Sequence, residues 1–168
     1  LVNNDLANTI GNLVNRTVAM ARKWFKGTPN PANKPGADHP LAVRAAAAVA
    51  AAPGHYNAMA FHLAAQDALQ LAIDANGFLR EQAPWSAIKN PDNAEQVAED
   101  IYAVLEAARL VGVLLAPLLP DFSSRLLKQL DQPALEWSSH SQWGGLSTGV
   151  PLPEPQPLLQ RLELEQPL

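Results

Sequence analysis

The sequence predicts an all-α fold, a helical bundle of four to five helices followed by an extended C-terminal tail. Apolar residues recur with the helical period of about 3.6 residues in several long segments. Hydrophobic residues make up 48% of the chain but aromatic residues only 6%, and the abundant alanine suits closely packed helices better than a β-sandwich. At 168 residues the length fits one domain with its own core. We therefore expect residues 1–134 to form the bundle and residues 135–168 to form an extended arm.

A first helix is expected from near the N-terminus to about Phe25. A polar stripe with four-residue spacing follows one side of it, formed by Asn4, Asn8, Asn12 and Arg16. Apolar residues follow the opposite side: Leu6, Ile10, Leu13, Thr17, Met20 and Trp24. This division predicts an amphipathic helix, and Gly27, directly after basic residues, predicts where the helix ends.

Residues 27–36 are expected to form a loop, because three prolines remove backbone donors and two glycines release the backbone. A second helix should then begin with Asp38 as its N-cap and Pro40 in its first turn, and end at Pro53 and Gly54. Its alanine run is a strong helix former and allows close approach to a neighbouring helix.

Three further helices are expected, at residues 57–82, 91–119 and 121–130. The apolar stripe of the third helix begins with Met59, Phe61 and Leu63. Pro84 ends that helix, because proline lacks the backbone N–H that a continuing helix needs. The residues after 130 are rich in glycine, proline and serine, which fits a tail that extends over the bundle.

Several classes of function are excluded or disfavoured by composition. The chain has no cysteine, so disulfides and thiolate metal sites are excluded. Its four histidines show no spacing typical of a metal site. No phosphate-binding loop or nucleophile motif is present. No apolar run of membrane-spanning length and no signal segment occurs, so we expect a soluble, cytoplasmic protein without a membrane partner.

The charge of the chain is unevenly distributed. The net charge is −4, but the first 36 residues sum to +4, so the remaining residues sum to −8. The overall negative charge argues against a nonspecific binder of polyanions. A positive end on an acidic body could still hold a nucleic acid by one face; a chance cluster of charge is the alternative.

The asparagines of the first helix suggest a binding role. Asparagine is a weaker helix former than glutamate or lysine, because its side chain competes for backbone hydrogen bonds. Its amide offers two donors and an acceptor without charge, and the guanidinium of Arg16 offers a fork of donors. Together these groups match the edges of unpaired bases. The alternative is that Asn3 or Asn4 caps the helix and the others are merely solvated.

Trp85, in the turn after the third helix, allows two interpretations. Its indole could plug the end of the bundle, or it could form an exposed platform on which a base stacks. Residue type and position leave this choice open.

Six segments of the sequence together carry a family resemblance. They are "DLAN" (5–8), "GNLVNR" (11–16), "KWFKG" (23–27), "APW" (83–85), "LEAARLVGVLLAPLLP" (105–120) and "PLLQRLE" (157–163). In order and approximate spacing they resemble the C-terminal helical domain of methionyl-tRNA synthetases. The resemblance implies an anticodon-binding domain of the class I aminoacyl-tRNA synthetase type.

The resemblance also implies roles for particular residues. Asn12 and Arg16 would hydrogen-bond anticodon bases, with Asn8 assisting one turn earlier. Pro84 and Trp85 would supply the stacking surface under the first base of the CAU anticodon. Phosphate contacts are expected from Arg22, Lys23 and Lys26.

The catalytic domain of the family is not found in this sequence, so we expect a fragment that is non-catalytic by itself and holds no cofactor. ATP and zinc would belong to the catalytic domain. The expected partners are the anticodon loop of methionine tRNA and the catalytic domain of the same protein, on which the arm could also pack; DNA is not expected. Two alternatives stay open: a helical protein-interaction bundle, and the corresponding domain of a sister class I synthetase.

Overall fold

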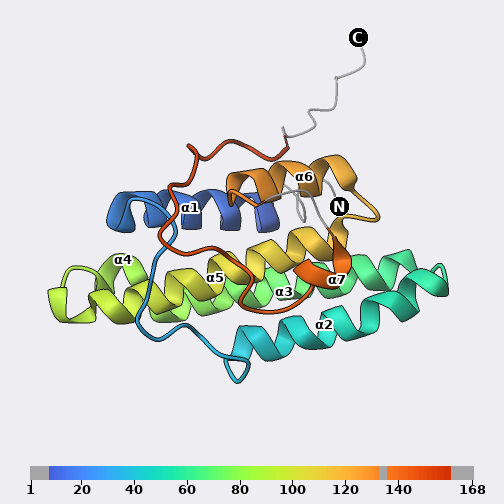
Figure 1. Ribbon diagram of the computed structural model, residues 1–168, viewed down its shortest axis with the longest axis horizontal. Helices are drawn as coiled ribbons and strands as arrows, with labels where there is room; N and C mark the ends of the chain where they lie inside the picture. The colour runs from blue at the N-terminus through green and yellow to red at the C-terminus, as the bar shows by residue number, and fades with distance from the viewer. Residues whose placement is uncertain (1–7, 133–135, 160–168) are drawn as a thin grey trace, which may run out of the picture.

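The structure of the protein, a computed structural model, describes residues 8–132 and 136–159, and every regular element within them is helical (Figure 1). In chain order they are α1 (Asn12–Phe25), α2 (Pro40–Asn57), α3 (Phe61–Gln82), α4 (Pro84–Ala87), the 3₁₀ turn η2 (Pro91–Asn93), α5 (Ala94–Leu115), α6 (Pro120–Gln129) and α7 (Trp137–His140). The all-α prediction is confirmed. No helix in the described residues is long and apolar enough to cross a membrane.

Helix α5 forms the centre of the bundle and packs against α1, α2, α3 and α6. From Asp100 to its end it is buried on all sides, and apart from three charged residues, Asp100, Glu106 and Arg109, this stretch is mainly apolar. Gly112 brings α6 close, because a Cβ at this position would lie 3.1 Å from Cδ2 of Leu126.

The second helix differs from prediction at both ends. His39 is its N-cap in place of Asp38, because the imidazole Nδ1 accepts a hydrogen bond from the Leu41 N–H at 3.2 Å. At the other end α2 continues through Pro53 to Asn57. Proline removes one helical hydrogen bond, but the hydroxyl of Tyr56 donates to the Leu114 carbonyl at 2.6 Å and holds the last turn against α5.

The predicted apolar stripe at the start of the third helix is wrong. α3 begins at Phe61, after Met59 adopts a left-handed conformation with φ of 54°. Met59, Phe61 and Leu63 are exposed, and burial begins at Ala64. In Figure 1 the turn between α2 and α3 projects past the end of α5, the helix at the centre of the bundle.

The segment between α3 and α5 contains structure that was not predicted. Pro84 follows Ala83, which is left-handed with φ of 43°, and occupies the first turn of α4. The same proline therefore ends one helix and begins another. Beyond it, the Asn90 side chain caps the 3₁₀ turn η2 by accepting from the Asp92 N–H, so α5 itself starts at Ala94 and not at Pro91.

The last two helices also differ from the sequence prediction in their bounds. α5 ends at Leu115, not at Leu119, and α6 begins at Pro120, one residue before the predicted start. The one-turn helix α7 was not predicted.

Residues 141–159 have no helix or strand and lie across the bundle. Leu146, Leu152 and Leu158 of this segment are buried in the core. The backbone also pairs with the loop after α1, where the Thr28 N–H donates to the Val150 carbonyl at 2.8 Å. Gly27 permits this approach, because a Cβ there would lie 2.2 Å from that same carbonyl oxygen.

Glu106 and Arg109 of α5 form a buried ion pair that fastens the C-terminal segment. Glu106 Oε1 lies 2.7 Å from Nη2 of Arg109, and both side chains are at most 1% exposed. The carboxylate accepts the backbone N–H groups of Gly144, Gly145 and Leu146. Arg109 donates in turn to the carbonyls of His140 and Gln142. We call these five backbone groups and the ion pair the carboxylate clamp.

Tyr102 adds a further bond to this region, since its hydroxyl donates to the Leu146 carbonyl at 3.2 Å. Burial, with the Glu106 charge adding to it, raises the pKa of Tyr102 to about 12. The hydroxyl therefore stays protonated and can donate at any physiological pH.

The N-cap of α2 gives the fold a pH dependence. Burial lowers the pKa of His39 from its ordinary value of 6.5, against smaller opposing effects of the Asp100 and Asp38 charges. A folded-state pKa below the unfolded value means that the unfolded chain binds the proton first as pH falls, so stability declines below pH 6.5. The protonated Nδ1 also cannot accept from Leu41.

We expect His39→Asn, which keeps a cap acceptor, to lose less stability than the wild type as pH falls below 6.5. Urea unfolding midpoints at a series of pH values measure this, with exposed His62→Asn as the control. Burial raises the pKa of Asp100 against smaller opposing effects that include the His39 charge. His39→Asn removes that charge, which further favours the folded state as pH falls and so acts in the same direction as the prediction. Parallel pH profiles for all three proteins would contradict the prediction.

Candidate nucleic-acid interface

The polar stripe of the first helix is present on the surface from Asn12 onward. Asn12 and Arg16 are exposed and lie one turn apart on α1. Residues 8–11 form a wider π-helical turn, so the regular spacing predicted for the stripe does not extend back to Asn8, which is half-buried. Asn4 lies outside the described residues.

Trp85 lies at the surface and does not plug the bundle. Its side chain is 40% exposed, whereas Pro84 beside it is buried and anchors the short helix α4. The guanidinium Cζ of Arg16 lies 5.5 Å from the centroid of the indole ring, a cation–π geometry. The fold thus brings together two features that are 69 positions apart in the sequence, the Arg16 end of the stripe and the tryptophan turn.

A groove of about 360 Å³ opens beside Arg16, between the start of the first helix and α3. Asn8, Thr9, Asn12 and Arg16 line one side of it, and Ile73, Asn76 and Arg80 line the other. The three α3 residues were not predicted as site residues. Their spacing of three and four places them on one side of a helix, which is the signal that could have found them.

Asn76 fixes the two walls of this groove to each other. Its Nδ2 donates to the Thr9 carbonyl at 3.2 Å and to the Ala72 carbonyl at 3.0 Å. The first bond satisfies a carbonyl of the π-helical turn from a neighbouring helix. The groove is therefore held by a side-chain bond as well as by packing.

The three basic residues predicted to contact phosphate do not share one face. Lys23 follows Arg16 by seven residues and is rotated from it by only ~20°, so it extends the polar stripe. Arg22 is rotated from Arg16 by ~120° and is half-buried. Lys26 caps α1 in a left-handed conformation with φ of 60°. The structure brings Lys23 onto the Arg16 side and leaves Arg22 away from it.

The charge of the groove is positive. Two of its lining side chains are arginines and none is a carboxylate. The acidic residues of the same stretch of α3, Asp74 and Glu81, line an adjoining hollow toward α2, which shares Ile73 and Arg80 with the groove. Asp74 is paired there with Arg44 at 3.2 Å. Amide donors, a cation and an exposed indole are the groups that bind unpaired nucleotides.

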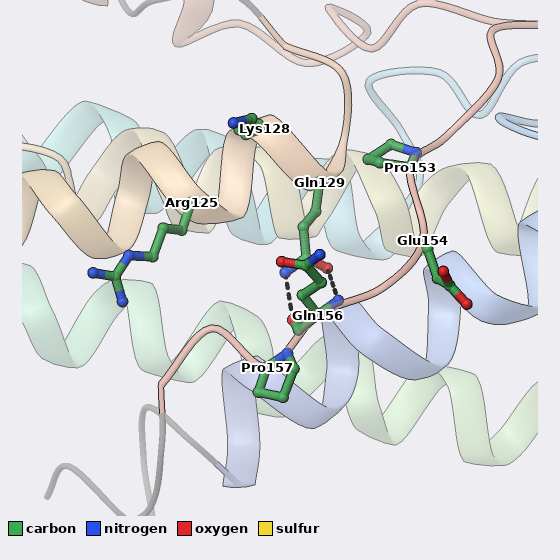
Figure 2. Close-up of a pocket in the computed structure, with 7 residues that line it drawn as sticks. All are labelled: Arg125, Lys128, Gln129, Pro153, Glu154, Gln156 and Pro157. Carbon is green, nitrogen blue, oxygen red and sulfur yellow. Dashed lines mark hydrogen bonds between the residues drawn. The ribbon is translucent and has the colours of Figure 1, made fainter.

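The hollow beside α6 has fewer side chains that are available to bind a ligand. A hollow of about 430 Å³ lies between α6 and residues 153–157, and Figure 2 shows Gln129 reaching across it to the backbone of Gln156. The Gln129 Nε2 donates to the Gln156 carbonyl at 2.6 Å and its Oε1 accepts from the Gln156 N–H at 3.4 Å, so this amide serves the fold. Within residues 8–132 and 136–159, no group of three or more potential metal ligands is found.

Comparison with known proteins gives a consistent result. The family model described as the anticodon binding domain of methionyl tRNA ligase matches residues 28–167. The methionine–tRNA ligase of Thermosynechococcus vestitus is 39% identical over 177 residues, covering 98% of this chain and 33% of the relative. That of Mycobacterium tuberculosis strain H37Rv is 31% identical over 169 residues, covering 99% and 33%. The chain thus spans about a third of the length of the curated relatives it matches.

A solved structure agrees in fold. The free-state crystal structure of Mycobacterium tuberculosis methionyl-tRNA synthetase matches with a TM-score of 0.84 at 30% identity, over 98% of this chain and 34% of that chain. The complex of the same synthetase with methionyl-adenylate matches with a TM-score of 0.80 over 94% of this chain.

Proposed function

Because the chain belongs to the family of anticodon-binding domains of methionyl-tRNA ligases, we propose that the surface around Arg16 and Trp85 recognises the CAU anticodon of methionine tRNA. The observation that carries this proposal is the 5.5 Å approach of the Arg16 guanidinium to an indole that is 40% exposed. Asn12 lies one helical turn away on the same stripe. An indole for stacking, a guanidinium and a side-chain amide thus lie together on one exposed surface.

Each group has a distinct part in the proposed recognition. The face of Trp85 stacks on the first anticodon base, an interaction worth about 1–3 kcal/mol per base by alanine substitution. Arg16 donates to a base edge, and the Asn12 amide both donates and accepts, which discriminates among bases by their own donors and acceptors. Asn8 assists from the adjoining turn.

Phosphate contacts set the position of the RNA without reading its sequence. Of the basic residues of α1, Lys23 has the placement that fits this task best, since it continues the stripe of Arg16. Arg22 and Lys26 were proposed for the same task, and they contribute from further round the helix.

In the full-length protein the domain performs a binding step and not the chemistry. The relatives are about three times as long as this chain, and we place the ATP-dependent charging of tRNA with methionine, together with the zinc site, in the part of the protein outside these residues. Binding energy at the anticodon holds the tRNA so that its acceptor end reaches that catalytic domain. By itself the chain is expected to be non-catalytic and free of cofactors.

Titration with anticodon stem-loops tests the proposal. A fluorescently labelled CAU stem-loop should bind at least about tenfold more tightly than a loop whose first anticodon base is changed, a difference of about 1.4 kcal/mol. Equal affinity for the two loops, or no binding of either, would remove the anticodon proposal. Preference for the changed loop would instead assign the domain to a sister synthetase.

The substitution Asn12→Asp tests whether the surface around Asn12 contacts the RNA. The added carboxylate should repel RNA and weaken CAU binding, while circular dichroism shows the helices intact. Asn57→Asp makes the same charge change at the end of the bundle away from α4 (Figure 1) and serves as the matched control. Equal effects of the two substitutions would show that the Asn12 face is not the contact.

A further inference from the structure

We propose that the groove between α1 and α3 is a second nucleotide subsite, in which Arg80 binds the phosphate of the nucleotide that follows the one stacked on Trp85. The inference rests on the proposed function and adds to it a contact from α3, a helix whose residues the sequence did not indicate as part of the site. Arg16 links the two subsites, because it both approaches the Trp85 ring and lines the groove.

The size and wall of the groove fit part of a nucleotide. Its volume of about 360 Å³ lies in the range of small-ligand sites. Ile73 is 43% exposed, although it lies on a helix whose other large aliphatic side chains in the same turns, Leu71 and Leu79, are buried. An exposed aliphatic side chain in such a groove offers an apolar contact to the face of a base or ribose.

Arg80 is available to an anion. Other arginines have partners: Arg44 pairs with Asp74 at 3.2 Å, and Arg125 donates to the Leu158 carbonyl. Arg80 is exposed, and its side chain makes no hydrogen bond or ion pair with the residues that the structure describes. Arg80 lies between the groove and the adjoining hollow that contains Asp74 and Glu81. On the groove side, which no carboxylate lines, its guanidinium suits a phosphate, whose oxygens can accept two of its parallel N–H groups.

The subsite does not need to be assembled on binding. Asn76 lies between Ile73 and Arg80 on the groove side of α3 and bonds to the Thr9 carbonyl at 3.2 Å. That bond holds the π-helical turn in place and with it the wall opposite Arg80. Asn76 is therefore a positioning residue, and Arg80 is the residue that touches the RNA.

A phosphate contact has a signature that separates it from base recognition. Removing one such contact weakens the binding of all RNA sequences by the same factor, and it reduces the dependence of affinity on salt concentration. Arg80→Gln should weaken binding of the CAU stem-loop about tenfold, as expected for loss of one charge-assisted hydrogen bond. The ratio of affinities for the CAU loop and the changed loop should stay the same. The slope of log affinity against log salt should become shallower by about 0.7.

Two further variants complete the experiment. Arg80→Lys keeps the charge and should keep the salt slope, with a smaller loss of affinity because it lacks the planar fork. Arg125→Gln removes the same charge from α6, away from the groove, and should leave the salt slope unchanged. Thermal unfolding of each variant confirms that the exposed substitutions leave the fold intact.

The outcomes distinguish the two proposals. If the wild type does not discriminate between the stem-loops, the proposed function fails. If the wild type discriminates but Arg80→Gln binds with unchanged affinity and slope, the subsite alone is refuted. If Arg80→Gln instead changes the ratio between the loops and not the slope, Arg80 contacts a base and the phosphate assignment is overturned.

Discussion

Replacing Glu106 by glutamine is expected to lower the free energy of unfolding by about 3–5 kcal/mol, the usual cost of removing one partner of a buried ion pair. The substitution conserves volume but leaves the Arg109 charge without a counterion in a site that is at most 1% exposed. It also places an NH₂ group where the carboxylate now accepts backbone N–H groups of the tail. Chemical denaturation measures the loss.

A matched control is available on the same helix. Glu99→Gln makes the same chemical change at a partly exposed position and should alter stability by no more than about 0.5 kcal/mol. Equal free energies of unfolding for the two variants would show that the carboxylate clamp does not stabilise the fold.

The clamp differs from a simple buried ion pair in its response to apolar replacement. Such pairs can often be exchanged for apolar residues of similar volume without loss. Here the pair also satisfies five backbone groups of residues 140–146. An apolar pair would leave all five without these partners, among them the buried N–H of Leu146. Unsatisfied buried polar groups are costly, so removing both charges together does not restore the stability.

Replacing Trp85 by alanine is expected to weaken CAU stem-loop binding by about 1–3 kcal/mol, which is roughly five- to 150-fold, with little change in thermal stability. The indole is 40% exposed, so its removal opens no internal cavity of the kind that makes core substitutions costly. The same change also removes the ring that Arg16 packs over. Titration and thermal unfolding of the same preparation measure both quantities.

Trp137→Ala serves as the control, because it removes an indole from α7, which is separate from the site. It should leave RNA affinity unchanged. A large drop in the melting temperature of Trp85→Ala with unaltered RNA affinity would identify Trp85 as a structural residue and not a stacking platform.

The sequence was sufficient to predict the five longest helices, but not all of their ends and not the short helices α4 and α7. Apolar periodicity identified α1, α2, α3, α5 and α6, because it reports which side of a helix is covered. The ends of these helices depend on individual side-chain and tertiary hydrogen bonds, which residue preferences for helix ends do not predict. The His39 imidazole replaced Asp38 as a cap, and Pro53 was tolerated within α2 because a tertiary hydrogen bond from Tyr56 holds the turn.

The candidate site was predicted in part. Spacing alone indicated that Asn12 and Arg16 share a face, but whether Trp85 is exposed depends on the left-handed Ala83 and on what covers α4. The contribution of α3 could not be predicted, since Ile73, Asn76 and Arg80 become a wall only when α1 lies opposite them.

The carboxylate clamp could not have been predicted from the residues that form it. Glu106 and Arg109, three positions apart on a helix, have the spacing of an ordinary surface pair. They are buried because residues 140–146, far along the chain, cover them and supply the matching backbone groups. The sequence pattern of α5 contains no information about the distant residues that cover the pair.

The clamp also sets an order of events during synthesis. α5 leaves the ribosome well before residues 144–146 do, so at that stage Glu106 and Arg109 must remain hydrated, and the helix cannot yet lose its water on that side. Dehydration of the centre of the bundle then coincides with the arrival of residues 140–146, which cover the pair.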